Sequence, residues 1–242
     1  MIADAARIVR KELLIRDQPI KAYELLEKLN LPELQKELDL TKAAIAHVFD
    51  KERYKKYYAE ELEEEPNPTS FKRYDWVVGK LGDVKTICDL GCGTGELVGR
   101  LSEKGIKATG VNLHKPSIEY ARKTYPKATF VEEDARDWKP AEKYDAVIAF
   151  EILEHIPDDK EFIKHCADLS NEWVYLCTPD GPVLDGDGNR DNWEHRGDGV
   201  RGHIRAYNEE TLRELLKDYT IGEFKKDTDN GVKYLYVQYK NG

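Results

Sequence analysis

Apolar runs and amphipathic stretches alternate along most of the chain. The runs rich in β-branched residues predict strands, whereas the stretches between them repeat apolar residues with helical spacing. The predicted strands cover residues 84–90, 106–112, 128–132, 144–150, 173–178, 220–224 and 232–239. Predicted helices cover 96–104, 158–169 and 209–218, and a further helix has Pro116 in its first turn. This alternation predicts an α/β fold, in which the almost wholly apolar strand 144–150 lies at the centre of a parallel sheet covered on both faces.

The first 70 residues differ from the rest of the chain. Residues 1–50 have the apolar spacing of helices without strand signals, and the acidic run 60–65 is followed by two prolines. We interpret 1–70 as an N-terminal helical cap or lid region, joined by this linker to a second domain at 71–242. The helices are candidates for a homodimer interface, and a helix-turn-helix that binds nucleic acid is the alternative.

Composition narrows the class of protein. A chain of 242 residues is long enough for one α/β domain and an appendage, and its net charge of −9 argues against a general binder of nucleic-acid backbone. Four cysteines without C-x-x-C spacing indicate reduced thiols, which predicts a cytoplasmic protein. No stretch has the length and apolarity of a membrane span, and the N-terminus has no uninterrupted apolar segment of the secretory kind.

A glycine-rich turn follows the first predicted strand. Gly91, Gly93 and Gly95 stand at alternate positions, Asp89 precedes them, and a helix follows at once. Glycine permits positive φ and lets a ligand approach the backbone, and the helix start offers unpaired N–H groups to an anionic group. The stretch D-L-G-C-G-T-G resembles motif I of the class I S-adenosylmethionine-dependent methyltransferases. This resemblance implies a Rossmann-like sheet of seven strands with the last one antiparallel.

The resemblance also implies where the cofactor binds. Its amino-acid end would lie on the glycine turn, its ribose on the end of the second strand, and its adenine on the loop after the third. The implied cofactor-binding residues are Asp89, Gly91, Cys92, Gly93, Gly95, Asn112, Leu113, Asp134, Ala135 and Phe150. Asn112 stands where the family normally has an acidic residue that accepts both ribose hydroxyls, and an amide offers one acceptor and a donor instead. Asp137 is an alternative to Asp134.

Aromatic residues upstream of motif I have two interpretations. In many methyltransferases of this class a helix here folds over the cofactor, so the resemblance makes Tyr57, Tyr58, Phe71 or Tyr74 candidate lid residues. They could equally pack the N-terminal region onto the second domain.

A second group of polar residues follows the fourth strand, in the pattern E-x-x-E-H. If this segment is helical, Glu151, Glu154 and His155 lie on one face, at the sheet edge where ligands bind in open α/β folds. The pattern resembles ubiquinone-pathway O-methyltransferases and small-RNA 3′-end 2′-O-methyltransferases. In both groups it is associated with a divalent cation, for which the later histidine here would be His203, with His195 as runner-up. Without a metal, Glu151 or His155 would act as a base or fix the loop by hydrogen bonds.

The loop after the fifth strand is long, which is typical of functional loops. We expect it to form a wall of the acceptor pocket and to contact substrate through Trp193, His195, Arg196 and Arg205. Its D-x-D-x-N-x-D stretch at 185–191 is similar to the start of an EF-hand loop, but it lacks the glycine at position six and the glutamate at position twelve. A plain solvated loop is the better interpretation.

Together these features predict a methyltransferase that uses S-adenosylmethionine. The predicted acceptor is a hydroxyl of a small molecule, a sugar or a phenol. The candidate catalytic residues are Glu151, His155 and His203. Mg²⁺ or another divalent cation could assist the transfer, and its candidate ligands are Glu151, Glu154, His155 and His203. RNA 2′-O-methylation and a catalytically inactive scaffold are the alternatives.

Overall fold

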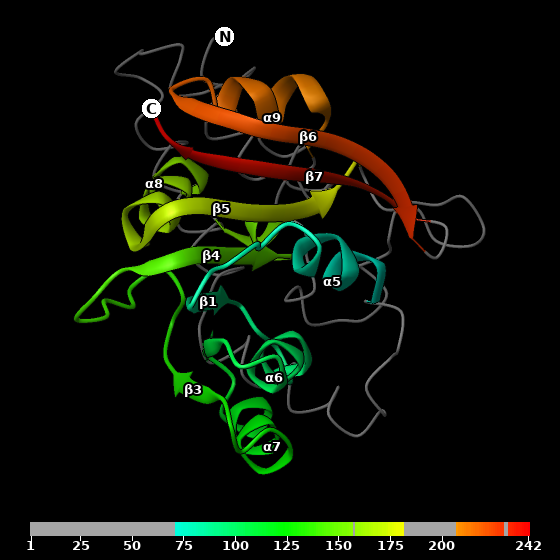
Figure 1. Cartoon of the computed structure of the whole chain (residues 1–242). Coiled ribbons are helices and arrows are strands. Elements are labelled where there is room, and N and C mark those ends of the chain that lie inside the picture. Colours follow the sequence, from blue (N-terminus) through cyan, green and yellow to red (C-terminus); the bar gives the residue numbers. More distant parts are fainter. Residues whose placement is uncertain (1–70, 157, 182–206, 230–231) are drawn as a thin grey trace, which may run out of the picture.

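The computed structural model describes residues 71–156, 158–181, 207–229 and 232–242 (Figure 1). Its centre is a seven-stranded sheet with the order β3-β2-β1-β4-β5-β7-β6. The strands are β1 Thr86–Leu90, β2 Lys107–Asn112, β3 Thr129–Glu132, β4 Tyr144–Phe150, β5 Ser170–Pro179, β6 Tyr219–Asp229 and β7 Val232–Asn241. The helices are α5 Phe71–Val78, α6 Glu96–Glu103, α7 Lys115–Thr124, α8 Asp159–Leu169 and α9 Glu209–Leu215, with a 3₁₀ turn η3 at Leu153–His155.

The strand directions confirm the predicted fold class. Strands β1 to β5 pair in parallel with one another, and β7 lies antiparallel between β5 and β6. Because parallel strands end at the same edge, β1, β2, β3 and β4 bring their carboxyl ends together. The glycine turn, Asn112, Asp134 and Glu151 therefore follow neighbouring strands at one edge of the sheet.

Helices cover both faces of the sheet, as the apolar pattern of β4 predicts. Val147 and Ala149 face the core that α8 and α9 complete, whereas Ala146, Ile148 and Phe150 face the core that α5, α6 and α7 complete. Alternate residues of one strand point to opposite faces, so a strand buried on both sides must be apolar throughout. Figure 1 shows α6 beside β1, α7 beside β3 and α9 beside β6.

The last two strands are longer than predicted. Residues 220–224 were expected as a strand, but β6 runs to Asp229 and pairs with β7 from Tyr219 opposite Asn241 to Asp229 opposite Val232. Its second half is rich in charged residues. This is typical of an edge strand, because charged side chains there disfavour pairing with another chain. The local apolar pattern underestimates the length of such a strand, because pairing with the neighbouring strand stabilises residues that have no apolar signal of their own.

The helical cap expected within 1–70 lies outside the described residues, as do the homodimer interface and the helix-turn-helix alternative placed there. None of the helices in the described ranges is both long and apolar enough to cross a membrane.

Candidate active site

The glycine turn connects β1 to α6 with three glycines at positive φ: 82° at Gly91, 54° at Gly93 and 80° at Gly95. Gly95 is the N-cap of α6 and provides no side chain to cap it. The first-turn N–H groups of α6 therefore receive no side-chain cap, and with the helix dipole they favour a negatively charged group.

Gly91 and Gly93 differ in the space that surrounds them. A Cβ on Gly91 would lie 2.8 Å from Cδ1 of Ile152, which is too close for any real contact. A Cβ on Gly93 would have no heavy atom within 4 Å. The space beside Gly93 is thus open, as a backbone cradle for a ligand requires.

Asp89 brings a buried carboxyl group to the start of this turn. The residue is 5% exposed, and no ion pair or hydrogen bond to its side chain is found within the described residues. Burial raises the pKa of Asp89 to about 7. A buried carboxyl group without a cation is costly when ionised, so this site favours a ligand that brings a positive charge, such as an amino-acid ammonium group.

Asn112 ends β2 beside the turn. It is 4% exposed, and its Nδ2 donates to the carbonyl oxygen of Gly93 over 3.4 Å. The partly buried Leu113 follows it. The predicted ribose position therefore contacts the predicted amino-acid position directly.

Asp134 lies after β3, buried, and is bound by Arg136. The backbone N–H and Nε of Arg136 donate to Oδ1 of Asp134 over 3.0 Å and 2.9 Å, and a second guanidinium nitrogen contacts Oδ2. Ala135 is also buried, whereas Asp137 is exposed. Of the two predicted adenine partners, Asp134 is therefore the buried one. The sequence reasoning missed Arg136, although a cation two residues after a turn aspartate is a usable signal.

Glu151 follows β4 with a strained backbone. Its φ is 53°, and it is the non-glycine residue with positive φ in the described ranges. Its N–H donates to the carbonyl oxygen of Cys177 over 2.9 Å, and its carboxylate lies 3.8 Å from Nη1 of Arg73 in α5. Such backbone strain at the carboxyl edge of a sheet is typical of functional positions.

Arg73 was missed from the sequence. Its guanidinium lies 4.7 Å above the ring of Tyr234 on β7 and faces Glu151, so α5 supplies a cation to the carboxyl end of β4. No local pattern marks this arginine, because its partners come from distant parts of the chain.

Glu154 points into the core. It is 2% exposed and accepts a hydrogen bond from Oγ1 of Thr178 over 3.1 Å. Burial, and next the charge of Glu151, hold the pKa of Glu154 well above its usual range, which favours the protonated carboxyl group.

The segment is not one continuous helix, so the condition for a shared face of Glu151, Glu154 and His155 is not met. The left-handed backbone at Glu151 breaks the helical spacing before η3 begins at Leu153. Among the described residues, no group of three His, Cys, Asp or Glu side chains is arranged to hold a metal ion. The predicted ligand His203 lies outside those residues.

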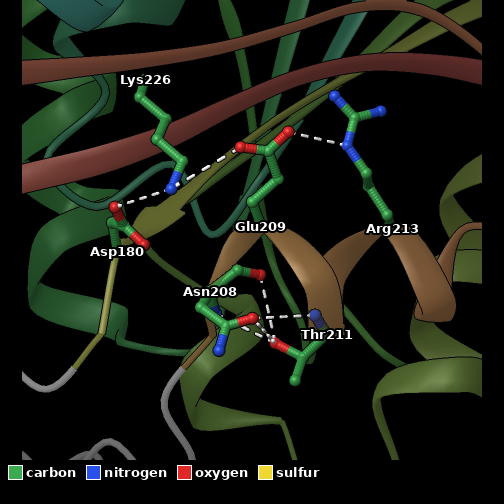
Figure 2. Close-up of polar contacts among 6 residues, drawn as sticks. All are labelled: Asp180, Asn208, Glu209, Thr211, Arg213 and Lys226. Carbon is green, nitrogen blue, oxygen red and sulfur yellow. Dashed lines mark hydrogen bonds and ion pairs between the residues drawn. The ribbon is translucent and has the colours of Figure 1, made fainter.

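The long loop enters and leaves the sheet at one place. Asp180 and Tyr207 form a parallel bridge, and Lys226 of β6 lies 3.4 Å from Asp180 and 3.6 Å from Glu209. Figure 2 shows these ion pairs above the capping box of α9, in which Asn208 and Thr211 exchange hydrogen bonds. The loop residues expected to touch substrate, and the calcium-like stretch, lie outside the described residues; they are Trp193, His195, Arg196, Arg205 and 185–191. The candidates Tyr57 and Tyr58 do so as well.

Comparison of the sequence with known protein families identifies the family of this chain. Residues 50–219 match the family described as a methyltransferase domain, which is well over half of the chain. The chain belongs to this family. The match confirms the resemblance to the class I S-adenosylmethionine-dependent methyltransferases that the glycine turn carries.

Curated relatives of this methyltransferase align over shorter stretches. A ubiquinone biosynthesis O-methyltransferase of Vibrio vulnificus (strain YJ016) is 34% identical over 105 residues, 40% of this chain and 45% of that protein. A trans-aconitate 2-methyltransferase of Escherichia coli O1:K1 / APEC is 34% identical over 91 residues, 37% of this chain and 36% of that protein. The chain thus spans less than half of the length of these relatives.

Solved structures share the fold. The 1,6-didemethyltoxoflavin-N1-methyltransferase of Burkholderia thailandensis, with bound S-adenosylhomocysteine, has a TM-score of 0.60 at 16% identity over 83% of this chain and 89% of that one. The magnesium protoporphyrin IX methyltransferase of Synechocystis PCC 6803, with bound SAM, has a TM-score of 0.55 at 18% identity over 74% and 86%. At these identities the likeness shows the fold.

Proposed function

We propose that this methyltransferase transfers the methyl group of S-adenosylmethionine to a hydroxyl oxygen of a small molecule. The observation that carries the proposal is the buried carboxyl group of Asp89 beside the open backbone of Gly93. This pairing suits a ligand that carries an ammonium group next to a carboxylate, as the methionine end of the cofactor does. Relatives named as O-methyltransferases support oxygen as the acceptor atom.

In the proposed complex, Asp89 accepts from the cofactor ammonium group, and the N–H groups at the start of α6 face its carboxylate. Gly91, Cys92, Gly93 and Gly95 form the cradle. Asn112 and Leu113 contact the ribose and one adenine face, Asp134 and Ala135 the adenine edge, and the buried Phe150 lies beside the cofactor at the end of β4.

The acceptor hydroxyl would lie near Glu151. In the transfer the oxygen attacks the methyl carbon, the carbon–sulfur bond breaks, and the products are the methyl ether and S-adenosylhomocysteine. The hydroxyl proton passes to the carboxylate of Glu151, which Arg73 stabilises in its ionised form at 3.8 Å. Most of the rate enhancement would come from alignment of oxygen, carbon and sulfur.

Assistance by a divalent cation is a separate proposal. It is supported by the E-x-x-E-H spacing and by His203. The described members of that set, Glu151, Glu154 and His155, do not fit a shared ion, because Glu154 is buried on Thr178. We therefore derive no step through a metal.

We also propose a cytoplasmic location and, through the N-terminal helices, a homodimer. The location is supported by the four cysteines, all in the described residues, none of which forms a disulfide. RNA as acceptor is the second candidate function; the E-x-x-E-H spacing favours it and the net charge of −9 opposes it.

The deciding experiment uses methyl-labelled S-adenosylmethionine with a cell extract. We expect label in the small-molecule fraction with the wild-type protein and none with Glu151→Gln, a variant that keeps the side-chain shape. Label in RNA would favour the second candidate. Absence of label together with absence of S-adenosylhomocysteine binding would favour an inactive scaffold.

A further inference from the structure

The hydrogen bond between Asn112 and Gly93 links the second strand to the glycine turn. We propose that Asn112 is a positioning residue: its amide holds the turn in the conformation that binds the cofactor, so the acidic residue usual in the family would weaken binding here. The inference rests on the proposed function only in that the turn binds S-adenosylmethionine and its product.

The end of β2 holds three successive residues of the turn. The N–H groups of Gly91 and Cys92 both donate to the carbonyl oxygen of Val111, over 2.9 Å and 3.1 Å. The side chain of Asn112 then donates to Gly93, the next residue along. The turn thus follows the strand end as a unit, with the amide as its last attachment.

Gly93 depends on this attachment. Its φ of 54° is held without packing on the Cα side, since a Cβ there would meet no heavy atom within 4 Å. Within the described residues its carbonyl oxygen accepts from the Asn112 amide and, weakly, from the Cys92 thiol at 3.8 Å. Loss of the stronger donor leaves the part of the turn that faces the ligand without its main restraint.

A carboxylate cannot replace this amide. It has no proton to donate, so at the same position its oxygen and the Gly93 carbonyl oxygen would be two acceptors that repel each other. The same sheet edge already carries the buried carboxyl groups of Asp89 and Asp134, and a third buried carboxylate would add to the cost of charge there. The amide avoids both penalties, and its Oδ1 accepts from a ribose hydroxyl.

The test measures binding, so it needs no known acceptor. Calorimetry would give the dissociation constants of S-adenosylhomocysteine and of 5′-methylthioadenosine, which has the ribose and adenine but no amino-acid end. Wild type, Asn112→Ala and Asn112→Asp are compared, and circular dichroism checks that each variant is folded.

We expect Asn112→Asp to weaken S-adenosylhomocysteine binding about tenfold or more, and at least as much as Asn112→Ala does. We also expect Asn112→Ala to weaken S-adenosylhomocysteine more than 5′-methylthioadenosine, because the turn contacts the amino-acid end. A ribose contact alone would lower both affinities by the same factor.

Two results would overturn the inference: tighter binding by Asn112→Asp than by wild type, or equal losses for the two ligands in Asn112→Ala. If Asn112→Asp does not fold, the comparison of the two ligands decides. Failure of the wild type to bind either ligand would instead contradict the proposed function.

Discussion

The guanidinium of Arg73 lies 3.8 Å from the carboxylate of Glu151, although one side chain comes from the helix before β1 and the other follows β4. The side chains are 13% and 32% exposed, so solvent screens the pair only in part. Arg73 also lies over Tyr234, which fixes its direction. The pair therefore joins α5, β4 and β7 at the predicted acceptor end.

The ion pair between Arg73 and Glu151 should contribute measurably to the free energy of unfolding. A double-mutant cycle of Arg73→Met and Glu151→Gln, measured by urea unfolding, should give a coupling free energy of about 1 kcal/mol. Lys217→Met, which removes an exposed ion pair with Glu214, is the control and should leave stability unchanged. A coupling energy indistinguishable from zero would mean that the pair does not persist in solution.

Asp89 should make stability depend on pH. Its folded pKa of about 7 is above the ordinary 3.8, so the folded protein keeps the proton while the unfolded chain releases it. The contribution of protonated Asp89 to the free energy of unfolding is therefore fully present below pH 4, and it is lost as the pH rises to about 7. The loss is on the order of 4 kcal/mol.

Asp89→Asn should therefore raise the melting temperature at pH 8 and have little effect at pH 4. Its affinity for S-adenosylhomocysteine should fall at pH 8, because the ammonium group loses its partner. In wild type, the affinity should fall as the pH drops below 7. Equal melting temperatures for the variant and wild type at pH 8 would contradict the raised pKa.

The left-handed backbone of Glu151 predicts an unusual stability order. Glycine adopts a φ of 53° at little cost, whereas alanine does not. Glu151→Gly should therefore be more stable than Glu151→Ala by about 1 kcal/mol in chemical denaturation. Both variants should lose methyl transfer and keep cofactor binding; an alanine variant as stable as the glycine variant would argue against the strain.

Variants of Glu154 distinguish a structural role of this residue from a role as a metal ligand. Because the carboxyl group of Glu154 is buried on Thr178 and burial raises its pKa, Glu154→Gln should change stability by less than about 1 kcal/mol and preserve methyl transfer in the presence of a chelator. Thr178→Val removes the hydrogen bond and should cost about 1 to 3 kcal/mol. Loss of transfer on chelation, together with an inactive Glu154→Gln, would support the cation proposal.

Local pattern predicted much of the fold because each element carried its own signal. The run from Tyr144 to Phe150 is apolar on both faces, and the structure buries it between two helical layers. The glycines at 91, 93 and 95 were predicted in a strand–turn–helix, since glycine tolerates positive φ wherever it stands in the chain. The charged half of β6 was missed, because its pairing with β7 is not local.

The sequence by itself determined the family, the alternation of strands and helices and the position of the glycine turn, because these follow from residue type and spacing along the chain. Only the tertiary structure decided the partners: Asn112 with Gly93, Arg136 with Asp134, Arg73 with Glu151, and Glu154 with Thr178. It also gave Glu151 a left-handed backbone, against the helical spacing. The physical reason is that a side-chain contact depends on how strands and helices from distant parts of the chain meet, and on a backbone angle at Glu151 that no helical pattern contains.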